Sequence, residues 1–327
     1  MTNQTSTMFL SDVSVVDHAF IDNEGHIIGG SFNPCFLVSG EVDPTEKVVV
    51  DFSTVKKSIK EIIDHKETGF DHKLWIIEGW SKCEVVVTSG LSHDGVSYES
   101  MYIMSPHVSL NVPTNAVKRI HLSELNMTSF DYYKYEDVAV WFNHHLQQQM
   151  QEIYPNINIR IETEITENMH HIFKSNPNRS DLIKFRYTHG LKDSTSWGCQ
   201  NIAHGHLSYM FTEYDPVIAT TINKTMIRNI INQQLEHIVQ DLHNVVFINK
   251  ENLTMDSTKQ LSYTTPRGSF SELIISDTNT KILNTETTIE YIVEFVKSYF
   301  DPSFIKLYGI KTLYVSEGLS KGAMIYF

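Results

Sequence analysis

Residues 202–209 constrain the fold most, because they set two histidines two positions apart inside an apolar run. Side chains two apart point to the same face of an extended strand, so His204 and His206 are predicted to project together from a β-strand. His189 ends another β-rich run fifteen residues earlier, where an adjacent strand would supply a third imidazole. With 16 histidines in the chain, such a pair can also arise by chance. Three imidazoles and an open position are typical of a catalytic zinc site, so we predict bound Zn²⁺.

The sequence around these histidines resembles the 6-pyruvoyltetrahydropterin synthase and 6-carboxytetrahydropterin synthase family, which has the tunnelling fold (T-fold). The resemblance consists of an aromatic-x-x-x-His strand, followed about fifteen residues later by a cysteine and then H-G-H. One spacing departs from the family pattern. Cys199 lies five residues before His204, whereas the family's cysteine normally lies four residues before this histidine. The extra residue either forms a bulge or displaces the thiol.

Later family signatures are partly retained in the same half. His243 falls at the family's L-D-H signature, although Leu242 replaces the aspartate. Residues 284–288, which include Thr285, fall at the P-T-x-E-N helix start. The closing V-x-E-T strand corresponds to residues 313–318, which include Glu317.

A degenerate second copy of the same frame precedes this one. Residues 17–20 resemble the first histidine strand, and Ile28-Gly29-Gly30 stands where H-G-H is expected, so this half should not bind zinc. It nevertheless keeps Asp71-His72 at the L-D-H signature and Glu162-Thr163 at the closing strand. In the resembling family each active site lies between subunits, so the resemblance implies that one fused chain divides a single site between its halves. The alternative is that the first half is only a scaffold with incidental matches.

The predicted fold class is α+β, with two tandem T-fold domains that each place two helices on one face of an antiparallel sheet. The domains are predicted at 1–173 and 182–327, joined by a linker at 174–181. Apolar spacing predicts helices, and β-rich runs predict strands. Of two expected insertions, the first contains two β-rich runs with a hairpin turn at Asp94-Gly95, and the second is expected to be rich in loops. The helices are expected at 53–66, 135–150, 224–242 and 286–299, the strands at 9–21, 33–42, 157–164, 183–190, 203–213 and 311–316, and the insertions at 84–104 and 250–282.

Composition restricts the kinds of binding partner and the location that we expect. The net charge of −13 with scattered Lys and Arg argues against nucleic acid, and no apolar run is long enough to span a membrane. Three cysteines and a start unlike a signal peptide favour a reducing, cytoplasmic location. In the resembling family the sheets join edge to edge, so we expect a homo-oligomer, either a trimer or a larger ring.

The resemblance implies a substrate and several residue roles. The substrate would be a pterin, 7,8-dihydroneopterin triphosphate, and Cys199 would be the base that removes a proton from carbon. His72, oriented by Asp71, would be the second acid or base, with His243 as a competitor for this role. A glutamate would anchor the pterin by accepting two N–H bonds from its amino-pyrimidinone edge. Glu162 is favoured over Glu317 because Thr163 follows it, and Thr285 is a further candidate contact.

The predicted function is therefore that of a zinc-dependent pterin synthase of the lyase class. The sequence does not choose between 6-carboxy- and 6-pyruvoyl-tetrahydropterin as product. Nor does it choose between a pathway to folate-like cofactors and one to deazaguanine bases such as queuosine. The alternative is a non-catalytic pterin- or purine-binding protein, or a ring-forming structural T-fold protein. The shifted Cys199, the lost aspartate and the two insertions support this alternative.

Overall fold

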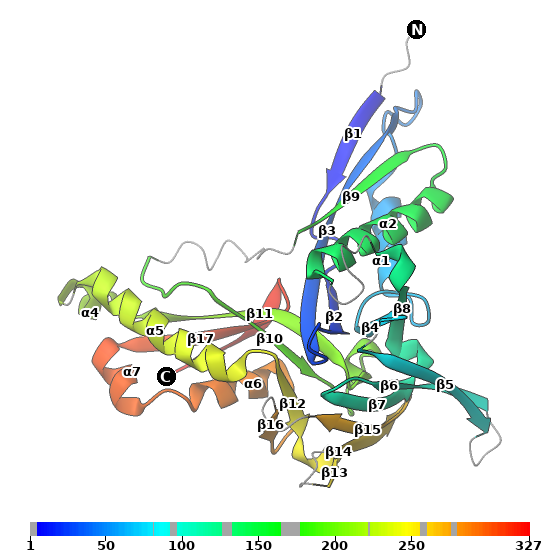
Figure 1. Cartoon of the computed structure of the whole chain (residues 1–327). Helices are drawn as coiled ribbons and strands as arrows, with labels where there is room; N and C mark the ends of the chain where they lie inside the picture. Colours follow the sequence, from blue (N-terminus) through cyan, green and yellow to red (C-terminus); the bar gives the residue numbers. More distant parts are fainter. Residues whose placement is uncertain are drawn as a thin grey trace.

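The computed structural model describes residues 5–80, 82–91, 97–125, 133–164, 177–221, 223–255, 260–275 and 280–327. It is a mixed α+β structure in which three six-stranded sheets meet (Figure 1). Among the described residues, no helix combines the length and apolar character that crossing a bilayer requires. Residues 174–176 of the predicted linker and the turn at Asp94-Gly95 lie outside the described residues.

The first sheet is built from the N-terminal half, in the order β1-β3-β2-β4-β8, with β9 also pairing with β3. Its strands are β1 (Thr5–Leu10), β2 (Val16–Ile21), β3 (Ile27–Glu41), β4 (Lys73–Glu78), β8 (Val117–His121) and β9 (Asn158–Glu164). The expected strand at 9–21 is thus two strands. Helices α1 (Phe52–Ile63) and α2 (Tyr135–Ile153) belong to this half. The Asp51 side chain caps α1 by accepting from the backbone N–H of Thr54 at 2.9 Å.

The second sheet is built from the C-terminal half, in the order β16-β12-β10-β11-β17-β18. Its strands are β10 (Ile183–His189), β11 (His204–Tyr214), β12 (Val245–Asn249), β16 (Thr280–Leu283), β17 (Ile310–Glu317) and β18 (Lys321–Tyr326). The helices of this half are α4 (Pro216–Thr221), α5 (Lys224–Leu242), α6 (Ile289–Lys297) and α7 (Pro302–Tyr308). Helix α5 has the predicted bounds. Its apolar face is buried against the sheet, and each such side chain stabilises the fold by about 1.5–3 kcal/mol.

The α+β class is as predicted, but both sheets are mixed rather than antiparallel, which corrects the predicted strand directions. Strand β4 runs parallel to β2 and β8, and β12 runs parallel to β10 and β16. The physical reason is a crossover connection, which neighbouring parallel strands need. Helices α1 and α5 lie in the connections that lead to β4 and β12, and the two insertions lie in those that lead to β8 and β16. The two halves share this plan, since the core order β9-β3-β2-β4-β8 is matched strand for strand by β17-β11-β10-β12-β16.

The two insertions form one joint sheet, in the order β13-β14-β15-β7-β6-β5. From the N-terminal half come β5 (Glu84–Leu91), β6 (Ser97–Met104) and β7 (Val108–Pro113), and from the C-terminal half come β13 (Leu253–Met255), β14 (Gln260–Thr265) and β15 (Gly268–Ile275). Short 3₁₀ turns follow β7 and β8 and precede β11 and β13: η1 (Thr114–Ala116), η2 (Leu122–Glu124), η3 (Gly198–Gln200) and η4 (Lys250–Asn252). The region 250–282, expected to be rich in loops, is therefore largely strand. Its strand β15 pairs with β7 of the other half.

The halves also meet where β3 crosses β11. Gly29 lies so close to β11 that a Cβ atom there would stand 2.5 Å from the backbone nitrogen of His206. The Arg186 guanidinium donates to the Gly29 carbonyl at 2.6 Å, and the Leu207 N–H donates to the Ser31 hydroxyl at 3.0 Å. The apolar core of the N-terminal half continues into side chains of the C-terminal half such as Ile202 and Phe270. This packing brings side chains of both halves into one site.

Candidate metal and thiol site

The three predicted zinc-binding histidines lie together at the end of β10 and the start of β11. His189 pairs directly with His204 across these antiparallel strands, and His206 follows two residues later on the same face. All three side chains are fully buried, and their ring nitrogens lie within 4.8 Å of one another. The alternation of side chains along two paired strands therefore gathers the imidazoles as the sequence predicted.

Hydrogen bonds fix which ring nitrogen faces the centre of this cluster. The Nδ1 atom of His189 donates to the Thr287 carbonyl at 2.6 Å, and the Nδ1 atom of His204 donates to the Asn201 carbonyl at 2.8 Å. Because a carbonyl only accepts, each Nδ1 carries the proton and each Nε2 presents a lone pair. The two Nε2 atoms of His189 and His206 lie 3.0 Å apart, and the buried Nε2 of His204 has no hydrogen-bond partner.

Converging lone pairs repel one another unless a cation lies between them. Burial lowers the pKa of His189 to about 3, and the neighbouring His206 lowers it further. Burial likewise lowers the pKa of His204 well below its usual range, and His189 adds to this effect. All of these features favour neutral imidazoles, which are the form that binds metal. The donor set thus fits a divalent metal ion such as zinc.

Asp17 completes the surroundings of the cluster from the N-terminal half, and sequence reasoning missed it. Its carboxylate lies 3.3 Å from the Nδ1 atom of His206, at ion-pair range without hydrogen-bond geometry. It also accepts from the Ser31 hydroxyl at 2.5 Å and lies 3.6 Å from the Lys321 ammonium. A carboxylate behind a metal-binding imidazole holds the ring in one orientation. The only sequence signal was an acidic residue within the mostly apolar run of residues 15–21.

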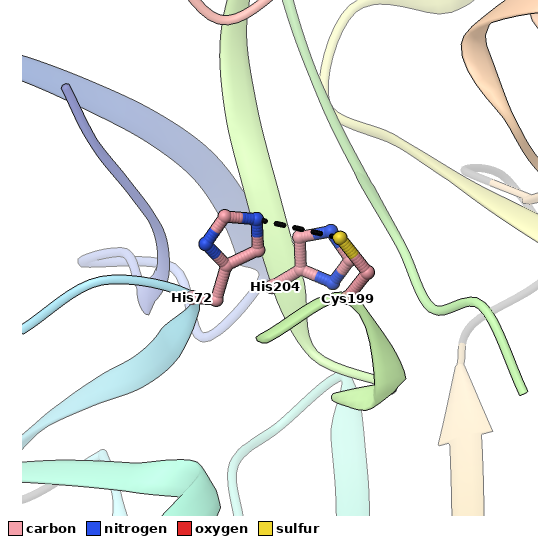
Figure 2. Close-up of side chains that lie close together, drawn as sticks. All are labelled: His72, Cys199 and His204. Atoms are coloured by element: carbon pink, nitrogen blue, oxygen red, sulfur yellow. Dashed lines mark hydrogen bonds between the residues drawn. The ribbon is translucent and has the colours of Figure 1, made fainter. Parts of the chain in front are cut away.

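Asp71, His72 and Cys199 form a chain of contacts beside the histidine cluster. Figure 2 shows the contact between His72 and Cys199 next to His204. The Asp71 carboxylate accepts a hydrogen bond from the Nδ1 atom of His72. The Nε2 atom of His72 lies 3.7 Å from the Cys199 thiol, and the rings of His72 and His204 are 4.9 Å apart. His72 comes from the start of β4, whereas Cys199 and His204 come from the C-terminal half. The structure therefore brings the retained signatures of both halves together within one chain.

These contacts change the pKa values of the thiol and the imidazole in opposite directions. Burial alone would lower the pKa of His72, but Asp71 and the Cys199 thiol outweigh burial and raise this pKa well above its usual range. Burial alone would raise the pKa of Cys199, but the hydrogen bond and charge of His72 outweigh burial and lower it. The geometry therefore favours a thiolate next to an imidazolium, which is a reactive form of cysteine.

The extra residue before H-G-H does not carry the thiol away from His72. Cys199 lies in the 3₁₀ turn η3, and its carbonyl accepts from the Leu191 N–H at 2.8 Å. Asn201, at the end of the turn, donates from Nδ2 to the His72 carbonyl at 3.1 Å. Gly198 packs against the His72 ring, since a Cβ atom at Gly198 would stand 2.7 Å from Cγ of His72.

The predicted pterin contacts lie in different places. Glu317 approaches the cluster, with its carboxylate 3.8 Å from Nε2 of His189 and 3.3 Å from the Lys321 ammonium. The Glu162 side chain is 56% exposed and pairs with Arg160 at 2.7 Å, so no described contact joins it to the cluster. Thr285 lies just before α6, where its hydroxyl donates to the Glu286 carbonyl at 3.0 Å.

His243 lies apart from Cys199. It lines a cavity of about 360 Å³ together with Arg186 and Tyr135. His243 ends helix α5, and Asn244 then precedes β12 with a φ of 57°. His72 precedes β4 with a φ of 53°, so Asn244, and not His243, corresponds to His72. The strand pairings agree, because Lys73 pairs with β2 where Val245 pairs with β10. The alignment of His243 with His72 was therefore one residue out of register.

No known protein family and no curated protein sequence matches this chain. Solved structures of 6-pyruvoyltetrahydropterin synthase from Plasmodium vivax are similar at 12% identity and a TM-score of 0.34, over 51% of this chain and 94% of that one. Variants of a catalytic residue of that enzyme give the same identity and TM-score, over 50% and 93%. The Plasmodium falciparum enzyme is similar at 14% identity and a TM-score of 0.30, over 50% and 100%. Such identities and TM-scores assign no activity to this chain.

Proposed function

We propose that this protein is a zinc-dependent pterin synthase of the lyase class that acts on 7,8-dihydroneopterin triphosphate. The observation that carries the proposal is the convergence of three buried imidazoles beside the Asp71–His72–Cys199 contacts. The product would be 6-carboxy- or 6-pyruvoyl-tetrahydropterin. The shared strand order of the two halves supports an origin by tandem duplication of a T-fold.

His189, His204 and His206 would hold the zinc ion. When bound, the ion would polarise the oxygens of the substrate side chain as a Lewis acid and so acidify the adjacent protons. The carbonyls behind His189 and His204 keep these two imidazoles in the tautomer that the ion requires, and the Asp17 carboxylate lies behind His206 at ion-pair distance. A buried set of neutral ligands of this kind also excludes water from the reacting atoms.

Proton transfer would use the thiol and imidazole that stand beside this cluster. The Sγ atom of Cys199, held as a thiolate by His72, would take a proton from carbon of the substrate side chain. The Nε2 atom of His72 would pass a proton to or from a substrate oxygen, and Asp71 would stabilise the resulting imidazolium. Groups positioned in this way typically contribute about 10²–10⁴-fold to a rate.

The pterin ring needs an anchor at some distance from the metal. Glu317 lies beside the ligand nitrogens, too near to reach the far edge of a bicyclic ring whose side chain is at the metal. Glu162 is exposed on β9, so we assign the anchor to Glu162 of a neighbouring copy in a homo-oligomer. Replacing Glu162 by Gln should then raise KM for the pterin and leave zinc content unchanged.

The test is to incubate the purified protein with 7,8-dihydroneopterin triphosphate and identify products by mass spectrometry, with zinc measured on the same sample. We expect one zinc per chain and a product that has lost its triphosphate. Cys199→Ala should abolish turnover and keep zinc, whereas Cys35→Ala, at a cysteine with no described contact to the cluster, should change neither. Bound zinc without any turnover would overturn the proposal and favour the non-catalytic pterin- or purine-binding alternative, or a ring-forming structural role.

A further inference from the structure

Arg267 is a buried cation that the proposed chemistry does not use. It lies in the turn between β14 and β15, within the insertion of the C-terminal half, and is only 3% exposed. No carboxylate among the described residues lies at ion-pair distance from its guanidinium, and burial lowers its pKa to about 10. A buried charge without an ionic partner is costly and needs its donors satisfied by other groups.

The guanidinium directs its donors at the turn that carries Cys199. Its NH1 group donates to the carbonyls of Trp197 at 3.2 Å and Gly198 at 2.9 Å, the two residues that precede the cysteine. Its Nε and NH2 groups donate to the side chain and backbone of Asn115, at 3.2 and 2.9 Å. Asn115 belongs to η1 of the N-terminal half, so one side chain ties the thiol turn to the other half of the chain.

The same hairpin holds the residue that follows the cysteine. The backbone N–H of Arg267 donates to the Gln200 side chain at 3.2 Å, and the Tyr263 hydroxyl donates to the Gln200 carbonyl at 3.0 Å. Next along the chain, Asn201 donates to the carbonyls of His72 and Ala116. Both sides of Cys199 are therefore fixed to the joint sheet and to the segment that carries His72.

We propose that Arg267 is a positioning residue that holds the Cys199 turn in register with His72, and that the joint insertion sheet serves to fix this thiol. The inference rests on the role given to Cys199 under the proposed function. Removing the guanidinium releases two carbonyls of the turn, so the turn shifts and the thiol loses its imidazole partner. The histidine cluster keeps its own hydrogen bonds, so zinc binding is unaffected.

The experiment measures how fast iodoacetamide alkylates each cysteine at pH 7 in the full chain, read by peptide mass spectrometry with Cys35 as the internal standard. In Arg267→Ala, alkylation of Cys199 should slow about tenfold, because the thiolate is the reacting form. Millimolar guanidinium should restore the rate in this variant alone, by refilling the vacated site. Arg267→Lys, a milder change, should show an intermediate rate. Arg160→Ala, which removes an exposed arginine, should behave as the unmodified protein.

Different results overturn different claims. If Cys199 reacts rapidly in the unmodified protein and equally rapidly in both Arg267 variants, the positioning role is wrong and the proposed function stands. The positioning role is also wrong if both variants lose reactivity only in step with a lower melting temperature and guanidinium restores nothing. If Cys199 of the unmodified protein reacts no faster than Cys35, its role as a base in the proposed function fails first.

Discussion

The two halves of this chain share one strand plan but differ at the three positions that gather histidines. Across β2 and β3, Phe20 pairs with Ile28 as His189 pairs with His204 across β10 and β11. By the same register Gly30 stands where His206 stands. The frame of the sheet is thus preserved by buried strands whatever side chains occupy those positions. The comparison teaches that the three clustered histidines can be replaced without changing the order and pairing of the strands.

In the N-terminal half, other side chains occupy the region that corresponds to the histidine cluster. The Tyr135 hydroxyl contacts Nε2 of His18 at 2.9 Å, and a Cβ atom at Gly30 would stand 2.1 Å from that hydroxyl. Burial lowers the pKa of His18 to about 3, so its ring is neutral and stacked on Trp75. One half therefore gathers imidazoles around a shared centre, and the other places the buried imidazole of His18 in contact with a phenol.

The largest effect should come from removing one imidazole of the C-terminal cluster. His204→Ala takes away a fully buried donor, so the bound zinc should fall from one per chain to none. Metal that binds only the folded state stabilises it by about 4 kcal/mol when its concentration exceeds Kd a thousandfold. Zinc analysis and thermal melting with and without a chelator measure both effects. His18→Ala is the matched change in the other half, and retention of zinc in His204→Ala would break the comparison.

The next largest effect should come from the acid–base pair. His72→Ala should lower turnover by about 10²–10⁴-fold, because a positioned proton donor and acceptor is lost. Zinc content should stay at one per chain, since His72 has no hydrogen bond to the three clustered histidines. Steady-state kinetics on 7,8-dihydroneopterin triphosphate gives the answer, with the exposed His144→Ala as the control. Unchanged turnover in His72→Ala would show that His72, and with it the N-terminal half, supplies no acid or base to the reaction.

A smaller loss should follow from crowding the same imidazole. In Gly198→Ala the added methyl group would stand 2.7 Å from Cγ of His72 and push the ring away from the thiol. Displacements of about 1 Å at a reacting group can cost about 100-fold in rate. The kcat value should therefore fall while KM changes little. A variant with full kcat would show that the contact between Cys199 and His72 is dispensable.

The smallest effect should come from the phenol of the N-terminal half. Tyr135→Phe removes the hydroxyl that contacts His18, so the free energy of unfolding should fall by about 1–3 kcal/mol, because a buried nitrogen loses its partner. Zinc content and turnover should not change. Denaturant unfolding measures the stability, and any loss of zinc would show that the two halves are coupled through β2 and β10.

Local patterns in the sequence were enough for part of this structure. Periodic apolar residues predicted α5 with its observed ends, and the two-residue spacing of His204 and His206 predicted one buried face. Both features depend on neighbours within a few residues, so they leave a signal in the sequence. The position of Asp71 and His72 next to Cys199 followed from the family resemblance and not from such a pattern.

Features set by distant pairing were missed or misplaced. His18 was matched to the first histidine strand, but the register of β2 with β3 gives that position to Phe20. No local sequence pattern indicates that β7 pairs with β15, because each of these strands also pairs with a strand next to it in the sequence. The contacts of Arg267 depend on that union, and those of Asp17 on the packing of β2 against β11, so their sequence neighbours could not reveal them.

The pairing of β7 with β15 also has a consequence for biosynthesis. Strand β7 emerges from the ribosome long before residues 268–275, so for part of translation it cannot pair with β15. The loop that presents the thiol depends on that late partner for its anchoring side chain. The newborn protein therefore cannot acquire an ordered thiol until Arg267 and the residues of β15 have been synthesised.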